Sequence, residues 1–559
     1  MFVKQEHFER AKRNRDKEPW STFYKALMKS ADEFLETQLP RVDRSRHNWI
    51  LEQARDLIRY SLVLAGAYRL TGEEKYADRC WYFILDMLEW DCWYWENSCS
   101  GTYKYDLTTG EIAYAFSMLF HLMEDWFGDS RMQKMLKVIY IRIIDTYLSA
   151  TDSDNHSGKT VVWYNWTNNW NAVCNGGMLC LALYLKDRYE DAKKAVSIAL
   201  RGLNYYIDAL HEDGSSPEGI VYWSYGLSYM TYALLSYESS MGQKHPVFSR
   251  KVLKDGLSFP FDFSPDGTGI SFGDVNSFFP NPVLYILAEQ AGKKELITEV
   301  TRRNLERSQE SPLYALLFCS DSYKYESGKK VEEEEKVRKW MKVYPDNGWG
   351  LFTSGCITMS FRAGSSNAPH THKDLNSIQL VKNKALLLEN IGNHPYTLGW
   401  FGEGRDLYAE NNTVSKNSML VNGGGQLKLA DAEWGYDEVS MWSDAACAYP
   451  VYVKKMFRKI SLEQNMIMMR DEFETTRMAW HEIRFLTYGS FEELQPGKWR
   501  VVKNGAEVIL CFEAGCELYY SPCEMPHSIG IRPSARMLRV ITKEPLSASY
   551  ICTSFLSTM

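Results

Sequence analysis

The chain of 559 residues carries 71 acidic and 64 basic side chains, a formal net charge of −7. This balance argues against nucleic acid as a partner, although a basic cleft for an acidic polymer is compatible with it. The length exceeds what one hydrophobic core usually organises, so we expect two domains. No apolar run approaches the roughly 18 residues of a membrane-spanning helix, so no membrane partner is expected.

The 12 cysteines are scattered singly, without Cys-x-x-Cys spacing. This usage is typical of reduced thiols rather than of a disulfide framework or a zinc knot. The first residues mix charged and polar side chains and lack the apolar stretch of a signal peptide. We therefore expect a cytoplasmic protein; a periplasmic or secreted one is the alternative if a leader has been removed.

From about residue 45 to residue 320 the apolar residues recur at helical spacing. Leu51, Leu57, Leu62 and Ala65 share one helix face, and a polar turn at 70–74 leads into a second helical pattern. Similar helix–turn–helix layouts recur at 183–192 and 287–296. Repeated hairpins make an open solenoid or a closed α/α toroid, and long aromatic loops favour the toroid. We predict an incomplete α/α toroid, the catalytic domain, over residues 1–325.

The pattern changes after this helical region. Residues 326–346 are rich in Glu and Lys and are predicted to form a charged connector. From residue 347 the apolar period becomes two, as in 356–362, 377–381, 506–512 and 537–542. Asn-Gly turns at 422–423 and 504–505 are typical of antiparallel hairpins. We therefore predict an antiparallel β-sandwich over 347–559 that contributes histidines to the catalytic cleft.

Three polar and aromatic segments carry the chemically capable side chains. They are 163–171, which alternates Trp with Asn; 213–225, a Gly- and Ser-rich loop that enters an aromatic helix; and 370–377, which reads His-Thr-His-Lys-Asp-Leu-Asn-Ser. Residues i and i+2 of a strand or tight turn point the same way, so His370 and His372 are expected to converge on one site. Aromatic faces beside polar groups favour a sugar-handling enzyme.

The order of these segments resembles that of the heparinase II/III-type polysaccharide lyases, a family related to uronyl C5-epimerases and alginate lyases. The motif residues that carry the resemblance are Asn165, the segment from Asp213 to Tyr222, and His370, His372, Asp374 and Asn376. The resemblance implies β-elimination on glycosaminoglycans of the hyaluronan, chondroitin or heparan type. The partner is thus an acidic polysaccharide or oligosaccharide, and the oligomeric state is not indicated.

In this chemistry a base removes the C5 proton of a 4-linked uronic acid. The carbanion forms beside a carboxylate, which must be neutralised or hydrogen-bonded. The resemblance assigns the carboxylate contact to Asn165, the base to Tyr222, and a second acid/base or carboxylate contact to His370. From the residues alone, Asn165 could equally serve a turn, and Tyr222 with Tyr225 could belong to the core.

Further residues are predicted to contact the substrate. Trp166 and Trp170 could stack on sugar rings, Asn169 could bond hydroxyl groups, and Arg405 could contact a carboxylate or sulfate, although Arg405 could also be part of an ordinary loop. The predicted substrate contacts are Trp166, Asn169, Trp170, Glu218, Tyr225 and Arg405.

The resemblance also implies a structural divalent metal ion. It assigns the ligands to His372, to Glu389 and to a third residue near Asn417, where relatives read His-Asn-Thr-Val and this chain reads Lys416-Asn417-Ser418-Met419. An Asn oxygen suits Mn²⁺ better than Zn²⁺, so manganese is favoured over zinc or calcium. The alternative is that no metal binds and that Glu389 pairs with His372. No organic cofactor is expected.

Two other functions stay open at this point. A uronyl C5-epimerase shares the first step but returns the proton to the opposite face. In a carbohydrate-binding or hydrolytic α/α toroid the histidines would be structural. A hydrolase would take its pair of catalytic carboxylates from Asp and Glu residues elsewhere in the chain. Phosphate-binding loops and dinucleotide fingerprints are missing from the sequence.

Overall fold

The computed structural model of the protein describes residues 1–40, 48–95, 104–152, 162–274, 278–320, 339–392, 396–397, 399–464, 466–528 and 532–557. The chain divides into two compact units, each assembled from separate segments. The first unit comprises Met1–Leu210, Tyr222–Leu257 and Phe279–Ser327. The second comprises His211–Val221, Ser258–Phe278 and Gly328–Met559.

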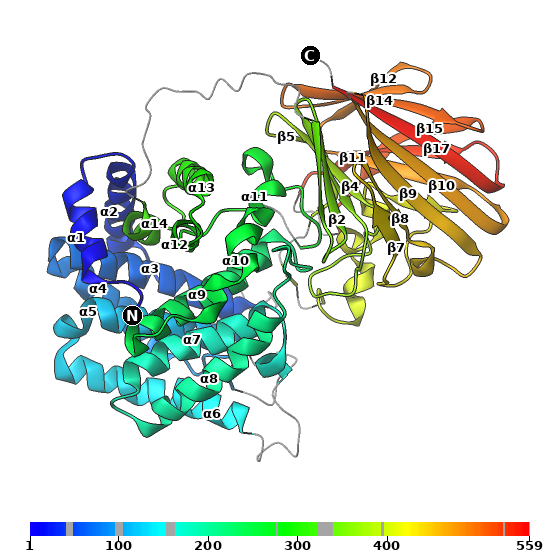
Figure 1. Ribbon diagram of the computed structural model, residues 1–559. Coiled ribbons are helices and arrows are strands. Elements are labelled where there is room, and N and C mark those ends of the chain that lie inside the picture. Colours follow the sequence, from blue (N-terminus) through cyan, green and yellow to red (C-terminus); the bar gives the residue numbers. More distant parts are fainter. Residues whose placement is uncertain are drawn as a thin grey trace. The chain divides into compact units, whose positions relative to one another are not determined.

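The first unit is helical (Figure 1). Its helices are α1 (Gln5–Asn14), α2 (Trp20–Glu36), α3 (Trp49–Thr71), α4 (Glu74–Glu89), α5 (Leu107–Ile139), which a π-helical turn (Tyr140–Asp145) joins to α6 (Thr146–Thr151), α7 (Asn169–Leu185), α8 (Glu190–Asp208), α9 (Ile220–Met241), which begins in the second unit, α10 (Lys251–Asp255), α12 (Val283–Gln290), α13 (Lys294–Glu306) and α14 (Pro312–Phe318).

Consecutive helices of this unit pair as hairpins, as their apolar spacing predicts. Helix α3 ends at Gly72, which adopts the left-handed conformation (φ 76°) and donates its N–H to the carbonyl of Tyr68. Glycine adopts this conformation without the penalty that a Cβ would add, so the chain turns sharply into α4. Helix α4 then packs back on α3.

Glycines let the helices that carry candidate residues approach closely. A Cβ at Gly177 of α7 would collide with the carbonyl of Gly110 of α5, and one at Gly176 would lie 2.9 Å from the carbonyl oxygen of Tyr229 in α9. Helix α7 is therefore held directly between α5 and α9. The contact with α9 lies at Tyr229, further along the helix whose first turns carry Tyr222 and Tyr225.

The second unit contains antiparallel sheets and the short helix α11 (Phe259–Asp262). One sheet has the order β1-β2-β3-β4-β5, a second β12-β13-β14-β17-β10-β9-β8-β7, and a third β15-β16-β11-β6. The strands are β1 (Lys339–Tyr344), β2 (Trp349–Ser354), β3 (Ile357–Arg362), β4 (Ile378–Lys382), β5 (Ala385–Leu388), β6 (Met419–Val421), β7 (Glu433–Tyr436), β8 (Ser440–Asp444), β9 (Val453–Glu463), β10 (Met466–Ala479), β11 (His481–Thr487), β12 (Ser490–Gln495), β13 (Lys498–Lys503), β14 (Ala506–Ala514), β15 (Leu518–Met525), β16 (Ala535–Thr542) and β17 (Leu546–Ser557).

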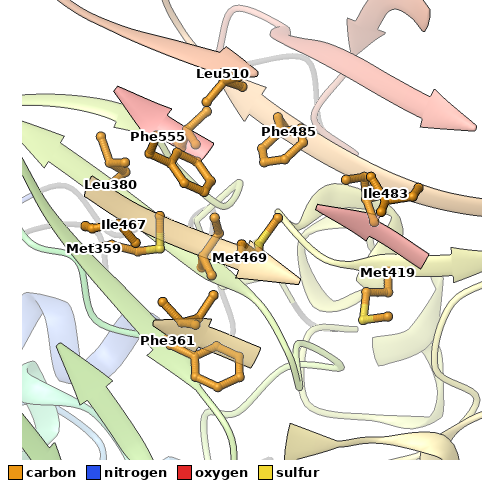
Figure 2. Packing of buried hydrophobic residues seen from close by; sticks show 14 of the residues in the cluster. Met359, Phe361, Leu380, Met419, Ile467, Met469, Ile483, Phe485, Leu510 and Phe555 are labelled. Carbon is orange, nitrogen blue, oxygen red and sulfur yellow. The ribbon is translucent and has the colours of Figure 1, made fainter. Parts of the chain in front are cut away.

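All three sheets contribute to one apolar core (Figure 2). Phe361 of β3, Met469 of β10 and Phe485 of β11 are fully or almost fully buried there. Buried and more exposed side chains alternate along most of β10, as in a sheet with one buried face, whereas nearly every residue of β3 and β11 is buried. Each such side chain contributes about 1.5–3 kcal/mol on burial, so the core holds the loops between the strands in place.

The predicted fold class, an α/α helical region followed by antiparallel β-sheets, is confirmed. The structure departs from the expected boundaries in two respects. Residues 339–344, assigned to the connector, form β1, which pairs with β2 along its whole length. The segments His211–Val221 and Ser258–Phe278 group with the sheets, although they lie within the expected helical domain. Residues 326–338 of the predicted connector lie outside the described residues.

The described residues can be compared with the expectations about membrane spans and cysteines. None of their helices combines the length and the apolar character needed to cross a membrane. Their cysteines are all free thiols.

Candidate active site

Two histidines of the second unit bind one buried carboxylate. Asp274 Oδ2 accepts from His370 Nδ1 at 3.0 Å, and its Oδ1 accepts from His372 Nε2 at 2.8 Å. The convergence of His370 and His372, expected from their spacing, is thus present. The carboxylate that joins them lies 96 residues before His370 in the chain.

Asp274 collects more donors than the two imidazoles. Tyr396 Oη and Trp400 Nε1 lie 3.3 and 3.5 Å from its Oδ2, and a guanidinium nitrogen of Arg405 lies 4.0 Å from the same oxygen. Burial alone would raise the pKa of Asp274, but the hydrogen bonds from His370 and His372 hold it well below its usual range. Asp274 is therefore ionised at any working pH.

The backbone brings Asp274 to the histidines through an unusual pair of turns. Gly273 has φ 83°, and a Cβ at that position would lie 2.5 Å from the carbonyl oxygen of His370. The same carbonyl accepts the backbone N–H of Asp274 at 2.9 Å. His370 itself adopts φ 60°, a conformation that non-glycine residues rarely adopt and that clusters at functional sites.

His372 is held neutral in one tautomer. Lys416 Nζ, which can only donate, lies 2.9 Å from His372 Nδ1, so Nδ1 accepts and Nε2 carries the proton given to Asp274. Burial, reinforced by the charge of Lys416, lowers the pKa of His372 to about 4. Burial lowers the pKa of Lys416 to about 8, and its Nζ also donates to the Ile391 carbonyl at 3.0 Å.

His370 is the more accessible of the two histidines. Its side chain is 11% exposed, whereas that of His372 is 1% exposed. Because Nδ1 donates to Asp274, Nε2 is the nitrogen that can exchange a proton with a bound molecule. A carboxylate behind Nδ1 orients the ring, which is the arrangement of a general acid/base histidine.

Asp374 and Asn376 fix the conformation of the 370–377 segment. Asp374 pairs with Arg362 at 2.9 Å, and both side chains are 1% exposed. Asn376 (φ 61°) donates to the Met456 carbonyl at 2.7 Å, while its own carbonyl accepts from Arg458. These contacts hold the loop rigidly against the sheets, so the two imidazoles are positioned before any ligand binds.

The residues predicted to bind a metal ion have other partners. Glu389 pairs with Lys503, Asn417 Oδ1 accepts from the Leu486 N–H at 2.7 Å, and both nitrogens of His372 are engaged as described above. A metal ligand must offer a lone pair, and His372 has none left. The residues present therefore do not fit a divalent ion held by His372, Glu389 and Asn417.

One group of possible ligands stands elsewhere in the second unit. Among the described residues, His211, Asp213 and Asp346 place ligand atoms within 4.8 Å of one another. Their polar atoms have protein partners: Asp213 accepts from the N–H of Asp346, which lies in another segment, and His211 contacts Ser215. These contacts account for the cluster as a loop-to-strand connection.

Arg405 and Glu218 were predicted to contact substrate. Arg405 is 23% exposed and donates to the carbonyls of Thr371 and Trp400 at 2.8 and 3.3 Å. It thereby ties the 400–405 segment to the histidine loop. Glu218 is buried. Both contacts with substrate stay predictions.

In the first unit, Tyr222 and Tyr225 lie one turn apart at the start of α9, and both are partly buried. Tyr225 donates its hydroxyl proton to Glu111, which also accepts two charge-assisted bonds from Arg55 at 2.6 and 2.9 Å. Burial, followed by the charge of Glu111, raises the pKa of Tyr225 well above its usual value. Tyr225 is therefore a poor base.

The Trp/Asn segment of the first unit is part buried and part exposed. Asn165 ends a 3₁₀ turn (Val162–Asn165) and is exposed, and Trp166 packs edge-to-face on Trp170 with ring centroids 5.7 Å apart. Asn169, at the start of α7, is buried. Asn171 donates to the Tyr164 carbonyl at 2.6 Å and so anchors the turn. The exposed amide and the aromatic pair are the groups of this segment that a sugar could reach.

Sequence reasoning missed Asp274 and assigned no role to Lys416. Asp274 lies in a loop without periodicity, and only its preceding glycine marks the position as one where backbones approach closely. Lysine is not a usual metal ligand, so the sequence gives no reason to choose Lys416 over its neighbour Asn417.

No protein-family model matches this sequence, and no curated protein sequence does. Solved structures do match. Heparinase III is 14% identical, with a TM-score of 0.66 over 94% of this chain and 79% of that protein. Heparan sulfate lyase from Pedobacter heparinus is 10% identical, with a TM-score of 0.57 over 100% and 93% of the two chains. A Paenibacillus xanthan lyase is 11% identical, with a TM-score of 0.60 over 96% of this chain and 57% of that one. The chain thus has the fold of these polysaccharide lyases.

Proposed function

We propose that this protein is a polysaccharide lyase that cleaves uronic-acid-containing polysaccharides by β-elimination. The observation that carries the proposal is the Asp274–His370 pair, a preoriented acid/base histidine on a fold shared with heparinase III, heparan sulfate lyase and xanthan lyase. Similarity of fold alone does not assign an activity, so the argument rests on the side chains.

The reaction requires three groups. A base removes the C5 proton of the uronate, the electron pair of the C5–H bond forms the C4=C5 double bond, and the C4–O4 bond breaks. A donor stabilises the negative charge that develops on the uronate carboxylate. An acid returns one proton to the departing O4.

We assign these roles to three residues whose side chains are at least partly exposed. Asn165 offers an exposed amide to the uronate carboxylate, and Tyr222 takes the C5 proton. His370 supplies or receives a proton through Nε2, since its Nδ1 is bound to Asp274. Tyr222 is preferred to Tyr225 because Glu111 holds the hydroxyl of Tyr225 in the protonated state.

The substrate class follows from this chemistry. β-Elimination needs a carboxylate at C5, and the two heparan-type lyases among the similar structures are named for uronate-containing glycosaminoglycans. We propose heparan-type chains or their oligosaccharides as the first substrates to test, with hyaluronan, chondroitin sulfates, xanthan and alginate beside them. The cytoplasmic location expected from the sequence stays a prediction.

Ultraviolet absorbance during incubation with this panel tests the proposal. Elimination leaves a double bond conjugated with the uronate carboxylate, which absorbs, so we expect the signal to rise on at least one substrate. A flat signal on every substrate would reject the lyase. Deuterium uptake at C5 from heavy water without chain cleavage would then identify the epimerase, and new reducing ends without absorbance would identify a hydrolase.

A further inference from the structure

A buried ammonium group lies at the end of the hydrogen-bond chain that positions the histidines. The chain runs from Lys416 Nζ to His372 (2.9 Å), from His372 to Asp274 (2.8 Å), and from Asp274 to His370 (3.0 Å). Lys416 is 1% exposed. Lysine is almost never buried so completely unless negative charge compensates it.

Three carboxylates provide that compensation. Burial lowers the pKa of Lys416, and the negative charges of Asp374, Asp274 and Glu410 oppose that shift, while the guanidinium of Arg362 adds to it. The Ile391 carbonyl accepts a second Nζ proton at 3.0 Å. Lys416 is therefore a cation built into the interior of the second unit, directly against His372.

This is the position at which the family resemblance places a divalent ion. A metal ion would need the lone pair of His372 Nδ1, but that lone pair accepts the Lys416 proton. It would also need Glu389, which is paired with Lys503. The ammonium and the ion are thus mutually exclusive on His372.

We propose that the ammonium of Lys416 replaces the divalent ion as the fixed cation of this site, so that His372, Asp274 and His370 are ordered without metal. Lys416 is a positioning residue. By donating to Nδ1 it forces the proton of His372 onto Nε2, where it bonds Asp274, and Asp274 in turn orients His370. The consequence for catalysis rests on the proposed function, whereas the cation and the tautomer do not.

Metal analysis of the purified protein and its His372→Ala variant gives the first test. Both proteins are expressed with added Mn²⁺ and Zn²⁺, purified without chelator, and compared by elemental mass spectrometry. We expect the same divalent metal content in both, since an ion held elsewhere, such as by Asp213 and Asp346, contributes equally. About one equivalent of metal present in the wild type and lost in His372→Ala would overturn the proposal.

Imidazole nitrogen NMR on ¹⁵N-histidine-labelled protein gives the second test and needs no substrate. We expect His372 to show a protonated Nε2 and an unprotonated, hydrogen-bonded Nδ1 in the wild type. Lys416→Met should shift the Nδ1 resonance, whereas Lys503→Met, the matched loss of a largely buried lysine, should not. A protonated Nδ1 in the wild type would overturn the proposal even if Lys416→Met fails to fold.

Kinetics separate positioning from mere support of the fold. If the lyase assignment holds, Lys416→Met should lower kcat about 10- to 100-fold and leave KM nearly unchanged, as loss of a group behind a catalytic histidine does. Lys416→Arg, which keeps the cation, should recover part of kcat. Equal kcat in wild type and Lys416→Met, with the lyase active, would refute the positioning role and leave the proposed function intact.

Discussion

Replacing Asp274 by Asn tests whether one carboxylate organises both histidines. The change keeps the shape of the side chain but exchanges one oxygen for an amide that donates. One imidazole can still donate to the remaining oxygen. The other imidazole faces the amide N–H of the substituted side chain and must rotate or change its tautomer. If that imidazole is His370, a change of tautomer protonates its Nε2, which can then no longer accept a proton.

The structure gives the size of both effects. Asp274 accepts two charge-assisted bonds in full burial, each contributing about 1.5–3 kcal/mol, and Asn preserves about one of them. We therefore expect Asp274→Asn to lower the free energy of unfolding of the second unit by about 1.5–3 kcal/mol. We expect kcat to fall by about 10²- to 10⁴-fold, the usual contribution of a correctly protonated acid/base.

Urea denaturation and initial rates of double-bond absorbance measure the two effects on the same preparations. Asp431→Asn is the matched control, because Asp431 is exposed and bonds only surface groups such as Asn367. The control should match wild type in both assays. An Asp274→Asn protein with wild-type kcat would refute the reasoning that Asp274 sets the protonation of His370.

Three further predictions concern other parts of the molecule. Tyr222→Phe should lower kcat by about 10²-fold or more with unchanged unfolding, while Tyr205→Phe, an exposed tyrosine of the same unit, should change neither; equal activity in both would remove Tyr222 as base. Burial lowers the pKa of His481 to about 4, so the unfolded chain binds the proton more readily than the folded protein does. The free energy of unfolding should therefore be unaffected by this group above pH 6.5 and should fall by about 3 kcal/mol as pH decreases towards 4. His481→Phe should flatten that part of a urea-denaturation pH series, and an unchanged slope would contradict this. Arg458→Met leaves Asp471 buried without its ion pair and should lower the free energy of unfolding in urea by about 3–5 kcal/mol. Adding Asp471→Leu should recover the part due to the unpaired carboxylate but not the bonds to the Asn376 and Asn417 carbonyls; a loss below about 1 kcal/mol in Arg458→Met would contradict this.

The regular elements could be predicted because their signal is local. The apolar residues around Leu57 repeat at the helical period and form α3, and the alternating segment 356–362 forms β3. Asn504 and Gly505 both adopt positive φ, as an Asn-Gly hairpin turn requires. Each of these expectations depended on neighbours within a few residues along the chain.

The site could be predicted only in part because its contacts are not local. His370 and His372 were found from their spacing, but their carboxylate, Asp274, comes from a loop that tertiary packing alone brings to them. The motif suggested a carboxylate ligand at Glu389, whose partner Lys503 lies 114 residues away. The ammonium on His372 is visible only once the chain is folded.

The mass of the products formed from a defined uronate-containing oligosaccharide tests the central claim most directly. Elimination divides the substrate without adding water, so the product masses sum to the substrate mass, and the new non-reducing end is unsaturated. The account predicts this result on at least one uronate-containing substrate that the absorbance panel identifies. Products whose masses sum to the substrate plus one water molecule would contradict the account and identify the protein as a hydrolase.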